Sequence, residues 1–290
     1  MTNIPYNVSS QPIRLGAISF VNTIPIYANF CPNNDVTLVY EVPARLNAMM
    51  RTGTLDISPV SSAYYLRNQE QLVLLDDLSV SSPGAVESVL FLSRTSLGPE
   101  LLALDSIQVP NDSETSVMLL AYLLQAATGH DLRSRFQVYE AAHYPETLRQ
   151  TGNALIIGDN ALMMKASLSQ QTQPYYCYDL STLWREKTGL PFVFAVWVAN
   201  RTWAEANPER LQAINTDLQA ARDEFFRDPD IFNQGLQTAQ ASSGLTEETL
   251  RRYYTQCLTY GLSSQHLASL NRFESIIQTF EPVEALPLDR

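Results

Sequence analysis

Short apolar runs alternate with segments of helical periodicity over the first 200 residues of the chain. Residues 86–93 (VESVLFLS) and 192–199 (FVFAVWVA) are nearly unbroken runs of strand-forming side chains. Residues 115–128 instead repeat apolar side chains at helical spacing, with Val117 and Leu124 on one stripe, which predicts a buried helix. Continuous apolar strands separated by helices are typical of parallel sheets covered on both faces. The pattern therefore predicts an α/β fold with mostly parallel sheets.

The same pattern gives the bounds of the expected elements. The expected strands are residues 13–20, 36–42, 54–58, 72–75, 86–93, 106–110, 136–140, 154–158 and 192–199. The expected helices are residues 43–52, 61–68, 115–128, 144–151, 160–167 and 181–187. From about residue 203 the pattern changes to successive helices, and Asn207-Pro208-Glu209 has the cap, the proline and the acidic residue of a helix start.

No linker rich in proline or serine divides the 290 residues into two separate domains. If there are two lobes, the chain crosses between them more than once, and the long apolar runs 86–93 and 192–199 are the candidate crossings. We expect one lobe to contain residues 1–94 and 190–290, including the helical tail, and the other to contain residues 95–189. A ligand cleft is expected between the lobes.

The formal net charge of −11 argues against nucleic acid or an anionic membrane surface as a partner. No apolar run is long enough to span a membrane, and the N-terminal residues have neither the basic nor the apolar region of a signal peptide. We therefore expect a cytoplasmic protein that is a monomer or a weak homodimer. With this charge, an anionic ligand has to be held by local dipoles and a few arginines.

Several common kinds of site are not indicated. Cys31, Cys177 and Cys257 lie far apart and lack CxxC spacing, so neither a disulfide framework nor a zinc site is predicted. The only lysines are Lys165 and Lys187, which argues against Schiff-base chemistry.

Known catalytic motifs are also absent from the chain. The sequence contains no GxGxxG, GxxxxGK[ST], HExxH or GxSxG segment. The three histidines, His130, His143 and His266, occur in unrelated contexts, which does not indicate a Ser/His/Asp triad.

Small hydroxyl and amide residues recur where expected strands end and helices begin. They are Asn22-Thr23, Ser61-Ser62, Ser81-Ser82 before Pro83-Gly84, and Ser113 with Thr115-Ser116. In open parallel sheets ligands bind at the carboxyl ends of the strands, and the free N–H groups of helix N-termini favour anions. These residue types are also the ordinary helix caps. The pattern leaves both interpretations open: a set of caps, or a polar cleft that suits an anion.

Six segments, in order over residues 14–197, carry a resemblance to a known family. They are ISFVNTIPIY, GTLDISPVSSAYY, GAVESVLFLS, SETSV, LIIGDNAL and TGLPFVFAVW. Together they resemble the chorismate dehydratases of the futalosine route to menaquinone. The resemblance implies a two-lobed fold like that of type II periplasmic binding proteins, located in the cytoplasm.

The resemblance also implies an activity and a set of site residues. Chorismate, a small dianion, would lose water to give 3-[(1-carboxyvinyl)oxy]benzoate, with no metal or cofactor. The positions that the family links to catalysis match Asn22 and Ser88 here. The expected substrate-binding residues are Thr23, Ser61, Ser62, Gly84, Ser113, Thr115, Ser116, Gly158 and Asp159. For Asp159 the sequence leaves a helix cap and an acidic residue at the rim of the site as alternatives.

Two positions depart from the family pattern. Ala85 stands where the family usually has proline, and Tyr64 stands where it often has glutamate. Other functions on the same fold also stay open at this point. They are a non-catalytic binding protein or sensor for a small anion, and the sister enzyme that cleaves a later futalosine-derived intermediate. A LysR-type effector domain is disfavoured, because no helix-turn-helix pattern precedes residue 14.

Overall fold

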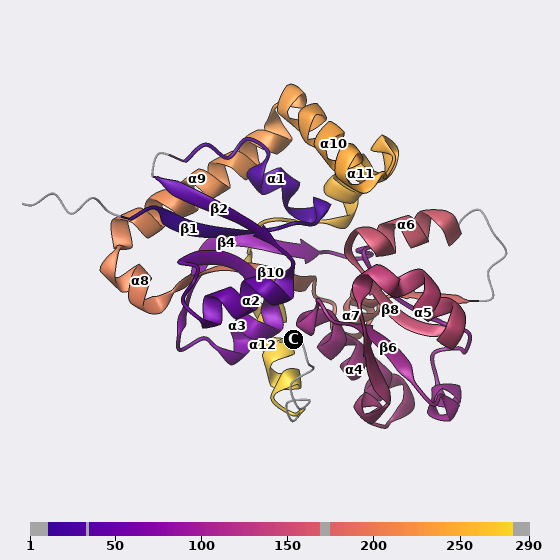
Figure 1. The fold of residues 1–290 in the computed structure, drawn as a ribbon. Coiled ribbons are helices and arrows are strands. Elements are labelled where there is room, and N and C mark those ends of the chain that lie inside the picture. The colour runs from indigo at the N-terminus through magenta and orange to yellow at the C-terminus, as the bar shows by residue number, and fades with distance from the viewer. Residues whose placement is uncertain (1–10, 33–34, 169–174, 281–290) are drawn as a thin grey trace, which may run out of the picture.

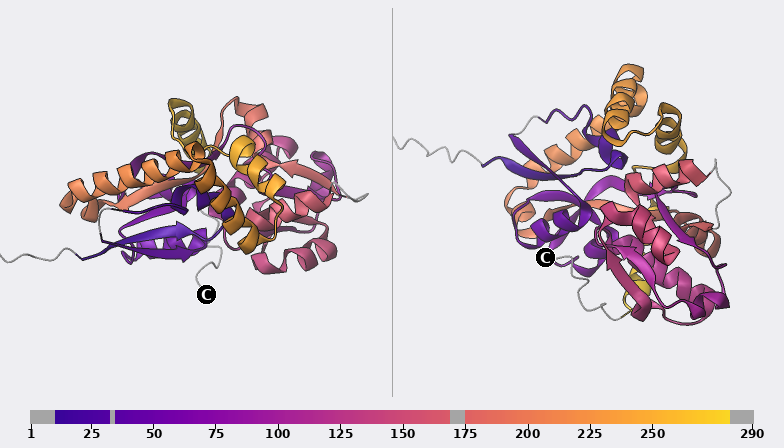
Figure 2. Two further views of the ribbon diagram at one scale, coloured as in Figure 1. Left: turned by 90° about the horizontal axis from the view of Figure 1, so that it is seen from above. Right: turned by 45° about the vertical axis from the view of Figure 1, so that its right-hand side comes forward.

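The computed structural model describes residues 11–32, 35–168 and 175–280, which form two lobes side by side (Figure 1; two further views in Figure 2). Each lobe is built on a five-stranded sheet. The first sheet has the strand order β2 (Val36–Glu41), β1 (Ile13–Ile18), β3 (Ile57–Ser61), β10 (Phe192–Asn200) and β4 (Leu72–Ser82). The second has the order β7 (Phe136–Tyr139), β6 (Ile107–Pro110), β8 (Asn153–Ile157), β5 (Val89–Ser93) and β9 (Tyr176–Asp179).

Helices cover both faces of the first sheet (Figure 1). On one face lie α2 (Pro43–Arg51), α3 (Ser62–Arg67) and α12 (Ser264–Ile277), and on the other lie α1 (Ile24–Tyr27) and α9 (Pro208–Arg227). The tail begins with α8 (Arg201–Ala206) and continues after α9 with α10 (Pro229–Ser243), α11 (Glu247–Arg252) and a π-helical turn, Tyr253–Cys257. Residues near the N-terminus and residues of the tail therefore share one core.

The second sheet is also covered on both faces. The apolar side chains of α4 (Glu114–Thr128) and α7 (Leu180–Thr188) pack in the same core as Phe91 and Leu155 of the sheet. On the opposite face, Leu148 of α5 (Tyr144–Thr151) and Ala161 of α6 (Gly158–Leu168) pack against Leu90. Strands that are apolar on both faces thus have helices on both faces, as the continuous runs predicted.

Both sheets are mixed. The pairs β1·β2, β1·β3, β6·β7 and β6·β8 are parallel, whereas β10·β3, β10·β4, β5·β8 and β5·β9 are antiparallel. The antiparallel pairs involve β5 and β10, the strands with which the chain enters the second lobe and returns to the first. An apolar run is equally compatible with either direction, so the sequence pattern did not predict the antiparallel pairs.

The first crossing between the lobes lies earlier than we expected. Residues 1–94 were expected to belong to the first lobe, but β5, Val89–Ser93, pairs with β8 and β9 in the second sheet. The crossing is therefore residues 83–88, and the expected boundary at residue 94 is wrong. The reason is that an apolar strand carries no mark of the sheet in which it pairs. The chain returns from α7 of the second lobe into β10 of the first.

Polar residues within strands account for the largest differences in element bounds. Strand β4 was expected at residues 72–75 but continues to Ser82, because Ser79–Ser82 pair with β10. The hydroxyls of Ser79 and Ser81 are buried there and are hydrogen-bonded to each other, 2.7 Å apart. Strand β9 was not expected at all, since its sequence, YCYD, is short and follows a polar stretch. Strand β3 begins at Ile57 rather than at residue 54.

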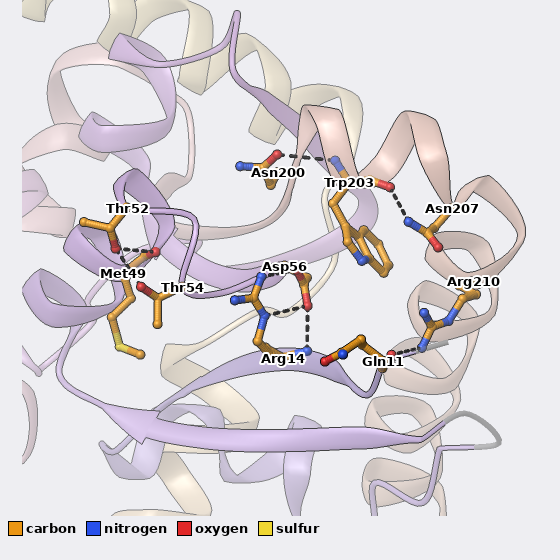
Figure 3. Close-up of polar contacts among 10 residues, drawn as sticks. All are labelled: Gln11, Arg14, Met49, Thr52, Thr54, Asp56, Asn200, Trp203, Asn207 and Arg210. Atoms are coloured by element: carbon orange, nitrogen blue, oxygen red, sulfur yellow. Dashed lines mark hydrogen bonds and ion pairs between the residues drawn. The ribbon is translucent and has the colours of Figure 1, made fainter. Parts of the chain in front are cut away.

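The amino ends of β1 and β3 are fixed by a polar cluster on the edge of the sheet opposite their carboxyl ends (Figure 3). The Asp56 carboxylate accepts hydrogen bonds from the backbone N–H of Arg14, at 2.9 Å, and from its guanidinium, at 3.0 and 2.6 Å. Arg210 of α9 donates to the carbonyl of Gln11, at 2.9 Å. Because these groups bond to one another, this edge serves to hold the strands in place.

In the part of the chain that the structure describes, no helix has the length and apolar character needed to cross a membrane.

Candidate functional site

A cavity lies between the two lobes, at the carboxyl ends of β1, β3 and β8. The space between its walls is about 550 Å³, including the part that is open to solvent. Its lining comes from both lobes, the crossing segment and the tail: Ile18, Phe20, Asn22, Pro43, Ser61, Val80, Val86, Ser88, Val89, Ser113, Thr115, Ser116, Ile157, Gly158, Phe194, Ala195 and Leu258.

Seven of the eleven site residues expected from the sequence line this cavity. They are Asn22, Ser61, Ser88, Ser113, Thr115, Ser116 and Gly158. The structure thus brings together groups from three of the four junctions singled out in the sequence, from the start of α6 at Gly158 and from the crossing segment.

The other four expected residues do not line the cavity. The Thr23 hydroxyl donates to the carbonyl of Ile18, at 2.8 Å, and the Ser62 hydroxyl donates to the carbonyl of Val193, at 2.7 Å. Both residues are buried and their hydroxyls donate to the backbone, so substrate contact by Thr23 and Ser62 stays a prediction that the lining of this cavity does not support. Gly84 lies in the loop before the cavity segment, where its N–H and C=O bind the Ser82 hydroxyl.

Asn22 is not a helix cap. It lies in the 3₁₀ turn Val21–Thr23, and neither this turn nor α1 has a side-chain cap bond at its start. Its Oδ1 atom is buried and has no hydrogen-bond partner among the described residues. A buried amide oxygen without a partner costs about 1–3 kcal/mol, so a polar group that faces the cavity without a partner is a candidate for ligand contact.

Three hydrogen bonds fix Ser88 and the residue before it. The preceding residue, Glu87, has a φ of 60°, and its N–H donates to the Asp179 carboxylate, at 2.7 Å. The Ser88 carbonyl accepts the N–H of Gly158, at 2.8 Å. The hydroxyl accepts a hydrogen bond from the phenol of Tyr253, at 2.8 Å. A non-glycine residue in the left-handed region is found where tertiary contacts fix the backbone, which here aims Ser88 at the cavity.

Two helices of the second lobe begin at the cavity. Ser113 caps α4 by accepting the N–H of Ser116, at 3.3 Å, so Thr115 and Ser116 lie in the first turn. The Thr115 hydroxyl oxygen accepts the N–H of Ala63 from the first lobe, at 3.0 Å, which leaves its own hydrogen for another acceptor. Helix α6 begins at Gly158. Both N-termini present partial positive charge to the cavity, which suits an anion.

None of the residues that line the cavity is an acid, histidine, lysine, arginine or cysteine. Asp159 directly follows the lining residue Gly158, and its carboxylate accepts the backbone N–H of Val21 across the cleft, at 3.3 Å. Burial raises the pKa of Asp159 to about 6. Asp159 lies in the first turn of α6 and bonds the segment before Asn22, so it is not itself the residue before the helix. Among the described residues, no group of three or more His, Cys, Asp or Glu side chains is arranged to hold a metal ion.

Asp112, beside the cap of α4, gives the fold a pH dependence. It is 7% exposed, its Oδ1 has no partner among the described residues, and burial raises its pKa to about 6. A carboxyl whose folded-state pKa lies above its unfolded value near 4 stabilises the fold below pH 4, and that contribution is lost as the pH rises through 6. We expect Asp112→Asn to raise the free energy of unfolding at pH 8 by roughly 1–3 kcal/mol, with no gain at pH 4.

Urea unfolding of both proteins at the two pH values measures this effect. The matched control is Asp105→Asn, which removes a charge from an exposed position of the same lobe and should change neither value by more than about 0.5 kcal/mol. A gain for Asp112→Asn that is equal at pH 4 and pH 8 would contradict the prediction.

Sequence reasoning missed the apolar walls and the contribution of the tail. Phe20, Phe194 and Leu258 line the cavity, and Tyr253 binds Ser88 from behind. Phe194 lies within TGLPFVFAVW, one of the segments that carry the family resemblance. No sequence pattern indicated that Leu258 and Tyr253 belong to the site, because a helical tail with buried tyrosines is typical of ordinary packing.

The chain is similar in sequence to known proteins. Residues 13–279 match the family described as menaquinone biosynthesis. A chorismate dehydratase from Thermus thermophilus is 34% identical over 202 residues, which are 66% of this chain and 71% of that protein.

Solved structures share the fold at low sequence identity. A protein from Archaeoglobus fulgidus, 15% identical, has a TM-score of 0.70 and covers 93% of this chain and 98% of its own. The aliphatic sulphonate-binding protein SsuA from Escherichia coli, 15% identical, has a TM-score of 0.64, covering 93% of this chain and 88% of its own. At this identity the likeness shows the fold alone, and it confirms the expected two-lobed architecture of periplasmic binding proteins.

Proposed function

Because this chain belongs to the menaquinone biosynthesis family that includes the chorismate dehydratases, we propose that it removes water from chorismate to give 3-[(1-carboxyvinyl)oxy]benzoate. The family makes the chain an enzyme with a small substrate, and the proposal assigns it to the hydro-lyases. The observation that carries the assignment is the convergence of Asn22, Ser88 and the N-terminus of α4 on one neutral cavity.

Substrate binding follows from the electrostatics of this cavity. Chorismate carries two carboxylates, and the protein as a whole is negative, so the attraction has to be local. The first turn of α4 supplies the Thr115 and Ser116 hydroxyls and the partial positive charge of the helix end. In this proposal it holds one carboxylate, and the N-terminus of α6 at Gly158 holds the other. The apolar walls, including Phe194, contact the ring.

The proposed elimination needs a base that the cavity does not supply. A proton leaves the ring carbon that bears the ether, and the hydroxyl leaves the neighbouring carbon, so that together they form water and the ring becomes aromatic. None of the lining side chains is a base at neutral pH. The enolpyruvyl carboxylate of the substrate itself is positioned to take the proton and to pass it to the departing hydroxyl. Such an intramolecular base is worth about 7–11 kcal/mol through proximity.

The protein then contributes orientation and hydrogen bonds. The Asn22 side chain, whose oxygen lacks a partner among the described residues, orients the hydroxyl or a carboxylate of the substrate. The Ser88 hydroxyl donates to the leaving hydroxyl and so stabilises the negative charge that develops there. The bond from the Thr23 hydroxyl to the Ile18 carbonyl and the bond from the Val21 N–H to the Asp159 carboxylate support the backbone on which Asn22 lies.

Incubation of the purified protein with chorismate tests the proposal directly. We expect an aromatic product that is lighter than chorismate by one water. Mass spectrometry and ultraviolet absorbance detect its formation. The control is the same incubation with protein unfolded by heat. If the native protein binds chorismate, measured by calorimetry, but forms no product, the chain is a binding protein or sensor and the dehydratase assignment fails.

A further inference from the structure

The hydroxyl of Tyr253 donates a hydrogen bond to the Ser88 hydroxyl, at 2.8 Å, from outside the cavity lining. Both residues are buried, with exposed fractions of 1% and 4%. Tyr253 is the first residue of the π-helical turn that follows α11. Short π-helical turns occur often at functional sites, because they displace side chains from the regular helical positions.

The direction of this bond determines which hydrogen bond the Ser88 hydroxyl can still make. Burial raises the pKa of the Tyr253 phenol, so the phenol stays protonated, and its single hydrogen is directed at the serine oxygen. The hydrogen of the Ser88 hydroxyl is then free to point to an acceptor in the cavity. A hydroxyl that accepts one hydrogen bond also becomes a stronger donor in another.

The backbone around Tyr253 is fixed to the same segment by further contacts. Arg252 forms an ion pair with Glu87, the residue before Ser88, at 2.7 Å. The next residue, Tyr254, donates from its hydroxyl to the carbonyl of Val21, at 2.9 Å. Val21 directly precedes Asn22, so two consecutive tyrosines of the tail reach the two segments that carry the candidate catalytic side chains.

We propose that Tyr253 is a positioning residue that fixes the Ser88 hydroxyl as a hydrogen-bond donor to the leaving hydroxyl of the substrate, an inference that rests on the proposed dehydratase function. It assigns to the helical tail a part in the reaction in addition to its part in the core. The residue acts on the rate through Ser88, so its loss affects kcat and leaves substrate binding nearly unchanged.

The test compares Tyr253→Phe with Tyr139→Phe. Tyr139 is also buried, and its hydroxyl donates one hydrogen bond to the carbonyl of Leu155, at 2.7 Å. Neither Tyr139 nor Leu155 lines the cavity. We expect Tyr253→Phe to lower kcat about 10- to 100-fold with KM changed less than about 3-fold. Tyr139→Phe should retain the wild-type kcat. Melting temperatures of the two variants show whether they lose similar amounts of stability.

A double-mutant cycle identifies the route of the effect. Under single-turnover conditions, Ser88→Ala and the double variant Ser88→Ala/Tyr253→Phe should form product at equal rates, because the tyrosine has no serine left to orient. If the double variant is slower than Ser88→Ala by the same factor by which Tyr253→Phe slows the wild type, Tyr253 acts independently of Ser88 and the proposal is overturned.

The outcomes also separate this inference from the function on which it rests. A wild-type protein that forms no product from chorismate removes the proposed function and this inference with it. An active wild type with equal kcat values for Tyr253→Phe and Tyr139→Phe removes this inference alone.

Discussion

Replacement of Ser88 by alanine is expected to lower kcat by about 100- to 1000-fold, the usual effect of removing one hydrogen-bond donor from the position where charge develops. KM should change little, since carboxylate binding is assigned to the N-termini of α4 and α6. The variant also leaves the buried phenol of Tyr253 without its acceptor, which should cost about 1–3 kcal/mol of folding stability. Initial rates at several chorismate concentrations, together with a thermal melt, measure both effects.

The control for this variant is Ser93→Ala. Ser93 is the last residue of β5 and is also buried. Its hydroxyl donates to the Asn153 side chain, at 2.8 Å, inside the second sheet. Its replacement should lower stability and leave kcat unchanged. If Ser88→Ala keeps a rate within about 3-fold of Ser93→Ala, Ser88 has no part in the reaction.

Replacement of Asn22 by aspartate is expected to lower kcat/KM by at least about 100-fold at pH 8. The change preserves the shape of the side chain but adds a negative charge to a cavity that is proposed to bind a dianion. Because burial disfavours the charged form, the introduced carboxyl should have a raised pKa. It is neutral below that pKa, so the variant should recover part of its activity as the pH falls from 8 to 5.5.

The pH profile of kcat/KM is the measurement that distinguishes charge from misfolding. The wild-type profile should not rise toward pH 5.5, and neither should that of the control Asn233→Asp, which adds the same charge at an exposed position of α10. If Asn22→Asp loses activity by the same factor at every pH, repulsion of the substrate is not the cause.

The sequence predicted the α/β class and most of the elements, because these depend on local periodicity. The second sheet and the crossing were harder to predict: Val89–Ser93 has the same apolar pattern in either lobe, and only its pairing with β8 and β9 decides its place. The same limit explains why β4 was expected to be shorter than it is. The Ser79 and Ser81 hydroxyls of this strand are hydrogen-bonded to each other inside the sheet. In the sequence alone, these polar residues indicated the end of the strand.

At the site, three of the four junctions singled out in the sequence line the cavity, but the pattern did not predict which side chain of each pair faces it. Ser61 lines the cavity, whereas Ser62, one position later, bonds to the backbone of β10 on another side. Adjacent residues at the end of a strand point in different directions, so a hydroxyl pair is ambiguous without the register. Tyr253 was not predicted, because it lies 165 positions from Ser88 in the chain and no local pattern links them.

The position of β10 in the first sheet has a consequence for the order in which the protein is made. This strand lies between β3 and β4, so β4 has no strand that joins it to the rest of the first sheet until residues 192–200 have left the ribosome. All five strands of the second sheet lie within residues 89–179, one uninterrupted stretch. Domains generally fold as units during synthesis, at about 5–20 residues per second. The second lobe is therefore complete first, and the N-terminal β–α segments wait for the return of the chain.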